Sequence, residues 1–274
     1  MSKQAKRDRQ RQNREVRRQY EQTIARRRKT FKTVRNFAIL AVPVLVLGIV
    51  LSVSNGSSGS SSAKSAAVAA GCRYVSTVPK TTKSTKQTEP PLTIDPTKTY
   101  TAQVDTSCGS FTILLDPKEA PRTVNSFVFL AKQKFYDGLT FHRVAKGFVL
   151  QGGDPNNDGT GDAGYNLPDE PPAAGYQVGS VAMANAGPGS SGSGFFVVTS
   201  ANGATGLGGP PYAYSILGQV TSGFDTVKRI NSLGSTNADP AKQIPKATVL
   251  IDKVTVTETS ASTTTTVPST TSTT

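Results

Sequence analysis

The sequence reads FHRVAKGFVLQGGD over residues 141–154, and this stretch contains the only histidine of the chain, His142. Its apolar residues predict two short strands, at 140–144 and 148–151, separated by the three residues Ala145, Lys146 and Gly147. The chain has no G-x-S-x-G elbow that could place a nucleophile beside the histidine, and it has no Walker loop. The stretch therefore favours neither hydrolysis nor nucleotide binding. Because side chains alternate along a strand, His142 lies on the face opposite Arg143, and we interpret it as structural.

Similar apolar stretches recur on both sides of this segment and predict eight strands in all. They lie at 100–105, 110–115, 140–144, 148–151, 179–184, 195–199, 214–220 and 248–257. One helix is expected to begin at Pro121, a residue type favoured in the first turn, and a second is expected over residues 224–233. Since strands and helices do not alternate, the sequence predicts a mainly β fold, a closed eight-stranded antiparallel β-barrel capped by two α-helices.

The net charge of +13 is concentrated at one end of the 274-residue chain. Residues 1–36 contain 14 of the 31 Lys and Arg residues but only 3 of the 18 Asp and Glu residues. The next 17 residues, 37–53, are uncharged and just long enough to cross a bilayer as a helix. A basic flank before an apolar span predicts a single-pass helix in the cell membrane, with the N-terminus cytoplasmic and the later residues outside.

This charge distribution also limits the partners of the protein. The chain after residue 36 carries 17 basic and 15 acidic groups, so its main body is nearly neutral and we expect no nucleic acid as partner. Anionic lipid is the candidate partner for residues 1–36. A nucleic acid or another acidic partner bound there would dissociate steeply with added salt.

Three other interpretations of the apolar segment stay open. Ser52, Val53 and Ser54 have the small-x-small pattern of a signal-peptidase site, so the segment could instead be a cleaved signal peptide. The letters VAAGC at 68–72 are similar to a lipoprotein processing site, although serine-rich rather than apolar sequence precedes them. The third interpretation is a buried core helix, for which no compact domain lies on the N-terminal side.

Composition also divides the chain beyond the apolar segment. Residues 54–97 are rich in small and polar residues and are predicted to be a flexible linker, and residues 258–274 a disordered Ser/Thr-rich tail. The folded domain is expected over residues 98–257. In an extracytoplasmic domain Cys72 and Cys108 could form a disulfide, although two free thiols, or thiols bound to a metal or an adduct, remain alternatives.

Three polar residues after the predicted strand at 148–151, Asp154, Asn156 and Asp158, are spaced as in the first half of a calcium-binding loop. The twelfth position, however, is Tyr165, where a bidentate carboxylate is required. Because Asp, Asn and Gly also form turns, we predict a turn here and no metal. With two cysteines and one histidine, the chain also cannot build a zinc finger or a cluster of imidazole ligands.

Three segments resemble the cyclophilin-type peptidyl-prolyl isomerases: FHRVAKGFVLQGGD at 141–154, VAMANAGP at 181–188 and GSGFFVVT at 192–199. The resemblance extends over residues 100–256, and its motifs stand in the order and spacing of that family. It implies a closed eight-stranded barrel capped by two helices, in agreement with the strand pattern. It also implies an enzyme that rotates X-Pro bonds in proline-containing polypeptides and assists their folding, with no cofactor.

Carried over by position, the resemblance assigns roles to eight residues of this chain. The catalytic arginine of the family falls on Arg143. The pocket for the proline ring falls on Phe148, Val149, Met183 and Phe196, and the contacts to the substrate backbone fall on Gln151, Ala184 and Asn185.

These residue types suit the reaction for a physical reason. Rotation about an X-Pro bond faces a barrier of about 18–20 kcal/mol, because amide resonance is lost as the bond twists. The twisted nitrogen regains a localised lone pair, which a guanidinium can hydrogen-bond only in that state. An apolar pocket holds the proline ring, and amide groups hold the peptide that precedes it. One side of the X-Pro bond can therefore rotate while the other stays fixed.

The chain departs from the family pattern around the pocket. Gly194 stands where a glutamine is usual, the chain has no tryptophan, and residues 202–214 carry extra Gly and Pro. The histidine that the family often has near the wall of the proline pocket aligns with Tyr214. These departures bear on substrate preference and on cyclosporin binding. They also motivate an alternative function, a low-turnover module or holdase that binds proline-containing segments on the same fold.

Overall fold

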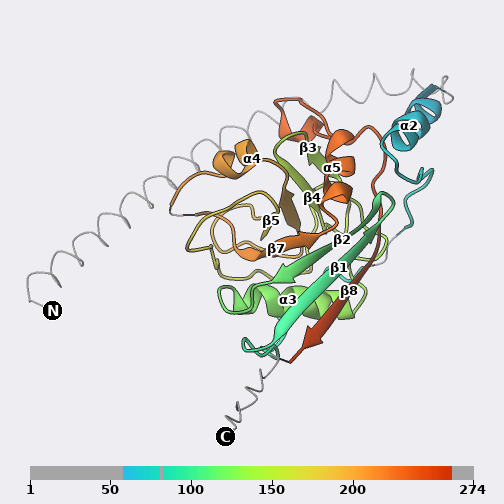
Figure 1. Ribbon diagram of the computed structural model, residues 1–274. Helices are drawn as coiled ribbons and strands as arrows, with labels where there is room; N and C mark the ends of the chain where they lie inside the picture. The colour runs from blue at the N-terminus through green and yellow to red at the C-terminus, as the bar shows by residue number, and fades with distance from the viewer. Residues whose placement is uncertain (1–57, 81–82, 211, 261–274) are drawn as a thin grey trace, which may run out of the picture. The chain divides into compact units, whose positions relative to one another are not determined.

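A computed structural model describes residues 58–80, 83–210 and 212–260 of the chain (Figure 1). Its strands are β1 (Thr99–Thr106), β2 (Gly109–Leu115), β3 (Arg143–Ala145), β4 (Val149–Gly152), β5 (Ser180–Met183), β6 (Phe195–Val198), β7 (Ile216–Ser222) and β8 (Ile251–Thr259). Its helices are α2 (Ser58–Ala69), α3 (Pro121–Lys132), α4 (Ala201–Gly206), α5 (Phe224–Ser232) and the 3₁₀ helix η1 (Pro240–Lys242). The strands form one sheet in the order β3-β4-β6-β5-β7-β2-β1-β8, with antiparallel neighbours throughout. The predicted mainly β, antiparallel fold is confirmed.

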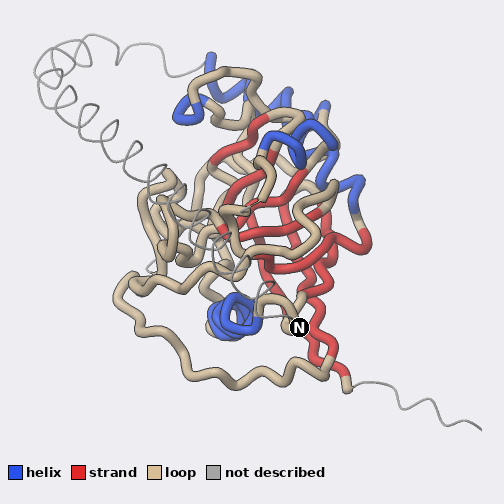
Figure 2. Tube along the Cα trace, turned by 90° about the vertical axis from the view of Figure 1, so that its left-hand side faces the viewer, coloured by secondary structure: helices blue, strands red, loops and turns tan. Residues whose placement is uncertain are grey.

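The strands, red in Figure 2, form a curled sheet. The segments that precede the edge strands β3 and β8 are joined by one bridge, between Thr140 and Leu250. Beside this bridge, the Phe141 N–H donates to the Val249 carbonyl oxygen at 2.9 Å. β3 and β8 themselves share no ladder among the described residues. The pairings thus establish a curled sheet, which is the main part of the barrel expected from the sequence.

One face of the sheet carries an aromatic core. Phe195 of β6 is fully buried and meets the rings of Phe127, Tyr136 and Phe141 edge to face, with centroids 5.7–5.9 Å apart. Alternation places the next residue, Phe196, on the opposite face, in a second and smaller apolar cluster. The paired phenylalanines therefore divide between the core and the face that will carry the site.

The two predicted helices pack against the sheet. α3 begins at Pro121, as expected, and contacts β7 and β8, whereas α5 contacts β2, β3 and β4. Ala120, which precedes α3, offers no capping side chain. Instead the carboxylate of Glu170, from a distant loop, accepts hydrogen bonds from the Arg122 and Thr123 N–H groups at 3.1 and 2.8 Å. This negative charge satisfies two unpaired donors at the positive end of the helix.

Parts of the segment 54–97, which the sequence predicts to be a flexible linker, are helical or bonded to the domain where the structure describes them. The first part of this segment forms α2, whose residue Ala67 is buried against the core. Its last part, residues 83–97 and hereafter the strap, is bound to α3. Asn125 of α3 accepts a hydrogen bond from the Thr93 N–H at 2.9 Å and donates to the Pro91 carbonyl oxygen at 3.0 Å. Composition could not reveal these contacts, because a buried Asn supplies them from another element.

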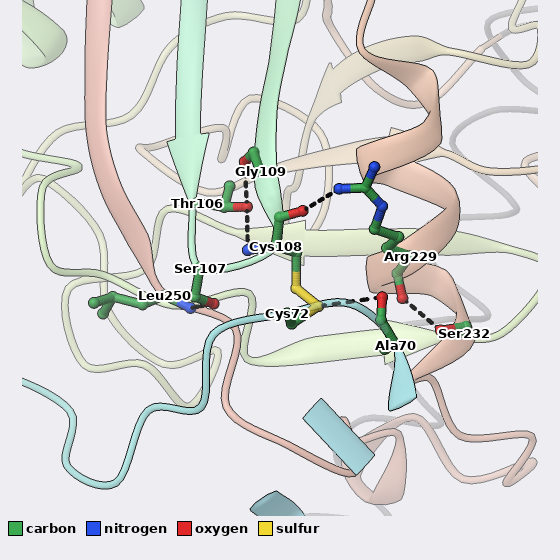
Figure 3. Close-up of a disulfide and its surroundings, with 9 residues drawn as sticks. All are labelled: Ala70, Cys72, Thr106, Ser107, Cys108, Gly109, Arg229, Ser232 and Leu250. Atoms are coloured by element: carbon green, nitrogen blue, oxygen red, sulfur yellow. Dashed lines mark hydrogen bonds between the residues drawn. A yellow bond between two sulfur atoms is a disulfide. The ribbon is translucent and has the colours of Figure 1, made fainter. Parts of the chain in front are cut away.

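A disulfide joins Cys72 to Cys108 and fastens the chain after α2 to the turn between β1 and β2 (Figure 3). Two hydrogen bonds flank it: the Arg73 N–H donates to the Ser107 carbonyl oxygen at 2.6 Å, and Arg229 of α5 donates to the Cys108 carbonyl oxygen at 3.0 Å. Of the alternatives that the sequence leaves open for the two cysteines, the structure contains the disulfide.

The limits of the folded domain differ from those predicted at 98 and 257. The domain begins before residue 98, with α2 and the strap, and β8 continues to Thr259. The basic segment 1–36, the predicted membrane span 37–53 and residues 261–274 of the predicted tail lie outside the described residues. Within the described ranges, no helix combines the length and apolar character that crossing a membrane requires.

Candidate active site

Arg143 is the first residue of β3, and its guanidinium lies between two glutamine side chains. Its Nη1 donates to Oε1 of Gln151 at 2.9 Å, and its Nε donates to Oε1 of Gln243 at 2.8 Å. Gln151 lies directly opposite Arg143 on β4, whereas Gln243 follows η1, 100 residues further along the chain. The guanidinium carbon lies 5.9 Å from the centroid of the Phe148 ring. A fixed positive charge is thus held at the edge of an apolar surface.

The guanidinium remains charged although the residue is half-buried. Burial lowers the pKa of Arg143 from its ordinary value, and Tyr214 opposes this with a smaller effect. Because a free guanidinium titrates above pH 12, it stays protonated near neutrality. Nη2 of Arg143 makes no hydrogen bond to any other described residue. This group therefore remains able to donate to a bound molecule.

The apolar surface beside Arg143 is the second cluster, on the sheet face opposite the core. It contains three of the expected pocket residues, Phe148, Val149 and Phe196. Helix α4 supports it, because Gly203 lies so close to the carbonyl oxygen of Phe148 that a Cβ at that position would collide with it. Gly203 of α4 therefore has a packing reason, and the helix packs against the backbone of Phe148 at the edge of this cluster.

Two tyrosines extend the wall of this cluster. The Tyr214 ring meets the Phe196 ring at 88°, with centroids 5.2 Å apart. The Tyr176 hydroxyl donates to the Tyr214 carbonyl oxygen at 2.7 Å and accepts from its N–H at 2.9 Å. Burial raises the pKa of Tyr176 to about 12, which keeps this hydroxyl protonated as the donor. Tyr176 was not predicted, since nothing in its local sequence distinguishes it from a loop tyrosine.

Met183 does not lie in this cluster, which corrects its expected role in the proline pocket. Its side chain is fully buried in the aromatic core, opposite Phe195 in the sheet. Its neighbours Ala182 and Ala184 belong to the second cluster instead. Successive residues of a strand face opposite sides, so the position next to Met183 and not Met183 itself can line the pocket.

The residues expected to contact the substrate backbone lie around the same surface. Asn185 donates from Nδ2 to the Ala213 carbonyl oxygen at 2.7 Å, and Ala184 packs against the second cluster. Gln151 uses its Oε1 for Arg143, while its Nε2 has no hydrogen bond to another described residue. Gly194 accepts a backbone hydrogen bond from Ala184 and leaves space, since a Cβ there would meet its nearest neighbour at an ordinary 3.6 Å.

Comparison with known families decides what this arrangement belongs to. A family model described as "Cyclophilin type peptidyl-prolyl cis-trans isomerase/CLD" matches residues 101–256. The chain is a member of the cyclophilin family. It is therefore a peptidyl-prolyl cis-trans isomerase, in agreement with the resemblance drawn from the three motifs.

Relatives and solved structures agree with this assignment. The chain is 38% identical to peptidyl-prolyl cis-trans isomerase B of Streptomyces anulatus, over 57% of this chain and 95% of the relative. It is 34% identical to peptidyl-prolyl cis-trans isomerase A of Mycobacterium tuberculosis, over 60% of this chain and 96% of the relative. A crystal structure of a Cryptosporidium parvum cyclophilin is similar with a TM-score of 0.51 at 25% identity, covering 58% of this chain and 98% of that one. A second structure of that protein, in the presence of the dipeptide Ala-Pro, has a TM-score of 0.50 at 26% identity, covering 57% of this chain and 98% of that one.

The loop after β4 in this cyclophilin is organised as a turn. Both carboxylate oxygens of Asp154 accept backbone N–H groups of the loop, among them Asn156, Asp158 and Gly161 at 2.9 Å each. Oxygens engaged in this way are not directed at a cation. Within the described residues there is also no cluster of three or more His, Cys, Asp or Glu side chains that could hold a metal ion.

His142 lies beside this loop and titrates below its ordinary range. Burial lowers the pKa of the imidazole and Arg143 adds to this, whereas Asp154 and Asp158 oppose it. The buried Nδ1 has no hydrogen-bond partner among the described residues. Both facts favour a neutral ring in the folded state and fit the structural role predicted for His142.

We therefore expect stability to fall as the pH drops from about 6.5, the ordinary histidine pKa, through the lower folded-state pKa of His142, because the unfolded chain binds the proton first. The only imidazole signals of the chain should titrate by NMR with a midpoint below 6.5. His142→Asn should remove the decline in the free energy of unfolding between about pH 6.5 and 5, measured by urea titration. A midpoint at or above 6.5 would contradict the assignment.

Proposed function

We propose that Arg143 is the catalytic residue of this isomerase, and that Phe148, Val149 and Phe196 hold the proline ring of the substrate. The observation that carries the proposal is a guanidinium fixed by two acceptors at 2.8 and 2.9 Å, with one nitrogen left free, beside an apolar cluster. No residue at this surface has to exchange a proton for such a site to work. This fits an isomerisation, in which no covalent bond is formed or broken.

The catalytic step follows from the charge of Arg143. In the planar ground state the prolyl nitrogen shares its lone pair with the carbonyl group and accepts hydrogen bonds poorly. As the bond twists, the lone pair localises and the guanidinium can donate to it. This hydrogen bond exists only near the transition state, so it lowers the barrier without tightening ground-state binding. A reduction of about 4–7 kcal/mol corresponds to an acceleration of roughly 10³ to 10⁵.

The substrates we propose are proline-containing polypeptides. The Cryptosporidium parvum cyclophilin crystallised in the presence of Ala-Pro supports this substrate class. The Nε2 group of Gln151 and the Oδ1 group of Asn185 make no hydrogen bond to other described residues, so they are available to hold the peptide before the proline. Holding that peptide while the ring rests on Phe196 lets one side rotate against the other.

The direct test is cis-to-trans turnover of a short X-Pro peptide by the full-length chain in detergent micelles. We expect saturable catalysis well above the uncatalysed rate. If the protein instead bound the peptide without accelerating isomerisation, the holdase function would replace the enzymatic one.

We also propose that the isomerase is anchored in the cell membrane by residues 37–53, with its domain outside the cytoplasm and its sheet closed into a complete barrel. The basic segment 1–36 before an apolar span supports this topology, and anionic lipid would be its contact. The Cys72–Cys108 disulfide supports it independently, because disulfides persist in oxidising compartments. For the barrel, the support is the Thr140–Leu250 bridge that joins the sheet edges.

The two cysteines of the chain allow a direct test of this location. Cells that make the protein are quenched in acid, which preserves the thiol state of Cys72 and Cys108. The protein is then treated with a maleimide of high mass, with and without prior reduction. An oxidising location predicts no labelling without reductant and double labelling after it. Double labelling without reductant would place the domain in a reducing compartment.

Removal of residues 1–54 should then impair folding of exported client proteins; unchanged folding would exclude a role for the anchor.

Gly194 offers a prediction about substrate affinity. Gly194→Gln should lower KM for a proline peptide about fivefold, because the added amide gains roughly one hydrogen bond, worth about 1 kcal/mol. The Cβ fits without collision. Gly194→Ala is the matched control, since it adds the same Cβ without the amide. Equal KM values for the two variants would show that the amide does not reach the substrate.

A further inference from the structure

We propose that Gln243 is a positioning residue that fixes the catalytic orientation of Arg143. This rests on the proposed role of Arg143 as the residue that donates to the prolyl nitrogen. Gln243 lies outside the three motifs that carry the family resemblance, in the segment that follows η1. Its Oε1 accepts a hydrogen bond from Nε of Arg143 at 2.8 Å, inside the site.

The amide of Gln243 can point only one way. Its Nε2 donates to the Asn237 carbonyl oxygen at 2.8 Å, which leaves Oε1 facing Arg143. A rotated amide would turn its NH₂ group toward the guanidinium, which has donors only, and would leave the Asn237 carbonyl facing another acceptor. The acceptor offered to Arg143 is therefore set in advance.

Hydrogen bonds also fix the backbone around Gln243. The Gln243 carbonyl oxygen accepts the Val144 N–H at 2.8 Å, so Gln243 is bonded to the residue next to Arg143. At the other end of this segment, Ser235 donates to the Val144 carbonyl oxygen and accepts the Lys146 N–H, both at 2.9 Å. Both ends of residues 235–243 are thus bonded to β3, at Val144, so the segment is a loop closed on that strand.

Together Gln151 and Gln243 hold the guanidinium from two different elements. Gln151, on β4, takes Nη1, and Gln243 takes Nε. Two acceptors in the plane of a rigid group define its orientation, whereas one acceptor allows it to pivot. The remaining Nη2 is then directed by the other two bonds. Loss of Gln243 should therefore lower the fraction of bound complexes in which Arg143 is aligned, which reduces kcat and leaves ground-state binding intact.

The test compares Gln243→Leu, Gln243→Glu and the control Gln133→Leu in the full-length protein. Gln133 is exposed and lies at the end of α3, where its side chain makes no hydrogen bond to another described residue. We expect Gln243→Leu to lower kcat about tenfold with KM within twofold and with unchanged thermal unfolding. Gln243→Glu retains an acceptor for Nε and should recover most of kcat.

Two further readouts separate positioning from a general structural effect. The Nε–H signal of Arg143, assigned by its absence in Arg143→Ala, should lose protection from solvent exchange in Gln243→Leu. In an Arg143→Ala background, Gln243→Leu should cause no further loss of kcat, because both changes act through one group. An unchanged kcat in Gln243→Leu, or an equal additional loss in the Arg143→Ala background, would overturn the proposal. If Arg143→Ala itself were fully active, the proposed function would fail instead.

Discussion

We expect Arg143→Ala to lower kcat/KM for an X-Pro peptide by about 100-fold or more, which corresponds to about 2.7 kcal/mol of lost transition-state stabilisation. The guanidinium is charged, lies beside the second apolar cluster and keeps a free donor, Nη2. If its hydrogen bond forms only with the twisted amide, as proposed, the loss should appear in kcat and not in KM.

Arg143→Lys should recover little of this activity. A lysine carries the charge but lacks the planar fork that contacts both Gln151 and Gln243, so its ammonium is not oriented. Arg122→Ala serves as control, since Arg122 pairs with Glu89 of the strap, outside the second apolar cluster. Turnover is measured with a chromogenic proline peptide. Retention of more than a tenth of the activity in Arg143→Ala would contradict the assigned role.

The second prediction is that substitutions of two adjacent phenylalanines have different effects, one mainly on stability and the other mainly on activity. Phe195→Ala should lower the free energy of unfolding by about 3–5 kcal/mol, as expected for a phenylalanine removed from a well-packed core. Its ring is fully buried and meets three other aromatic rings. In a domain of this size the loss should lower Tm by roughly 6–20 °C.

Phe196→Ala should instead lower kcat/KM more than tenfold, with a smaller decrease in stability, because its ring belongs to the second cluster beside Arg143. Thermal unfolding and peptide turnover measured on both variants give a two-by-two comparison. Each variant is the other's control, since both remove the same ring from neighbouring positions of β6. Equal changes of stability and activity in the two variants would contradict the division of the sheet into a core face and a site face.

The sequence contained enough information for the sheet and for most of the site. Alternating apolar residues marked the strands, and the segment 141–154 brought Arg143, Phe148, Val149 and Gln151 together, since it folds into one hairpin. The error at Met183 arose because a motif gives the order of residues and not the side of the sheet on which each one lies. Alternation counted from Phe196, which pairs with Ala182, could have corrected it.

Other features depended on contacts between distant residues and left no local signal. Gln243 lies 100 residues from Arg143, and Glu170 lies 48 residues from the helix end that it caps. The strap was predicted to be flexible because its composition is polar and rich in proline. Its binding to α3 depends on the ion pair between Glu89 and Arg122 and on the buried amide of Asn125, a residue that helical periodicity alone would place in the apolar face.

The disulfide also determines how the domain would respond to mechanical load. Cys72 and Cys108 are separated by 36 residues in sequence, and the bond between them bypasses the strap and all of β1. A pulling force applied to the chain ahead of α2 would therefore pass from Cys72 directly into the β1–β2 turn. The strap on α3 would carry no tension while the bond is intact. After reduction the same force would peel the strap from α3 first and reach the sheet only at the start of β1.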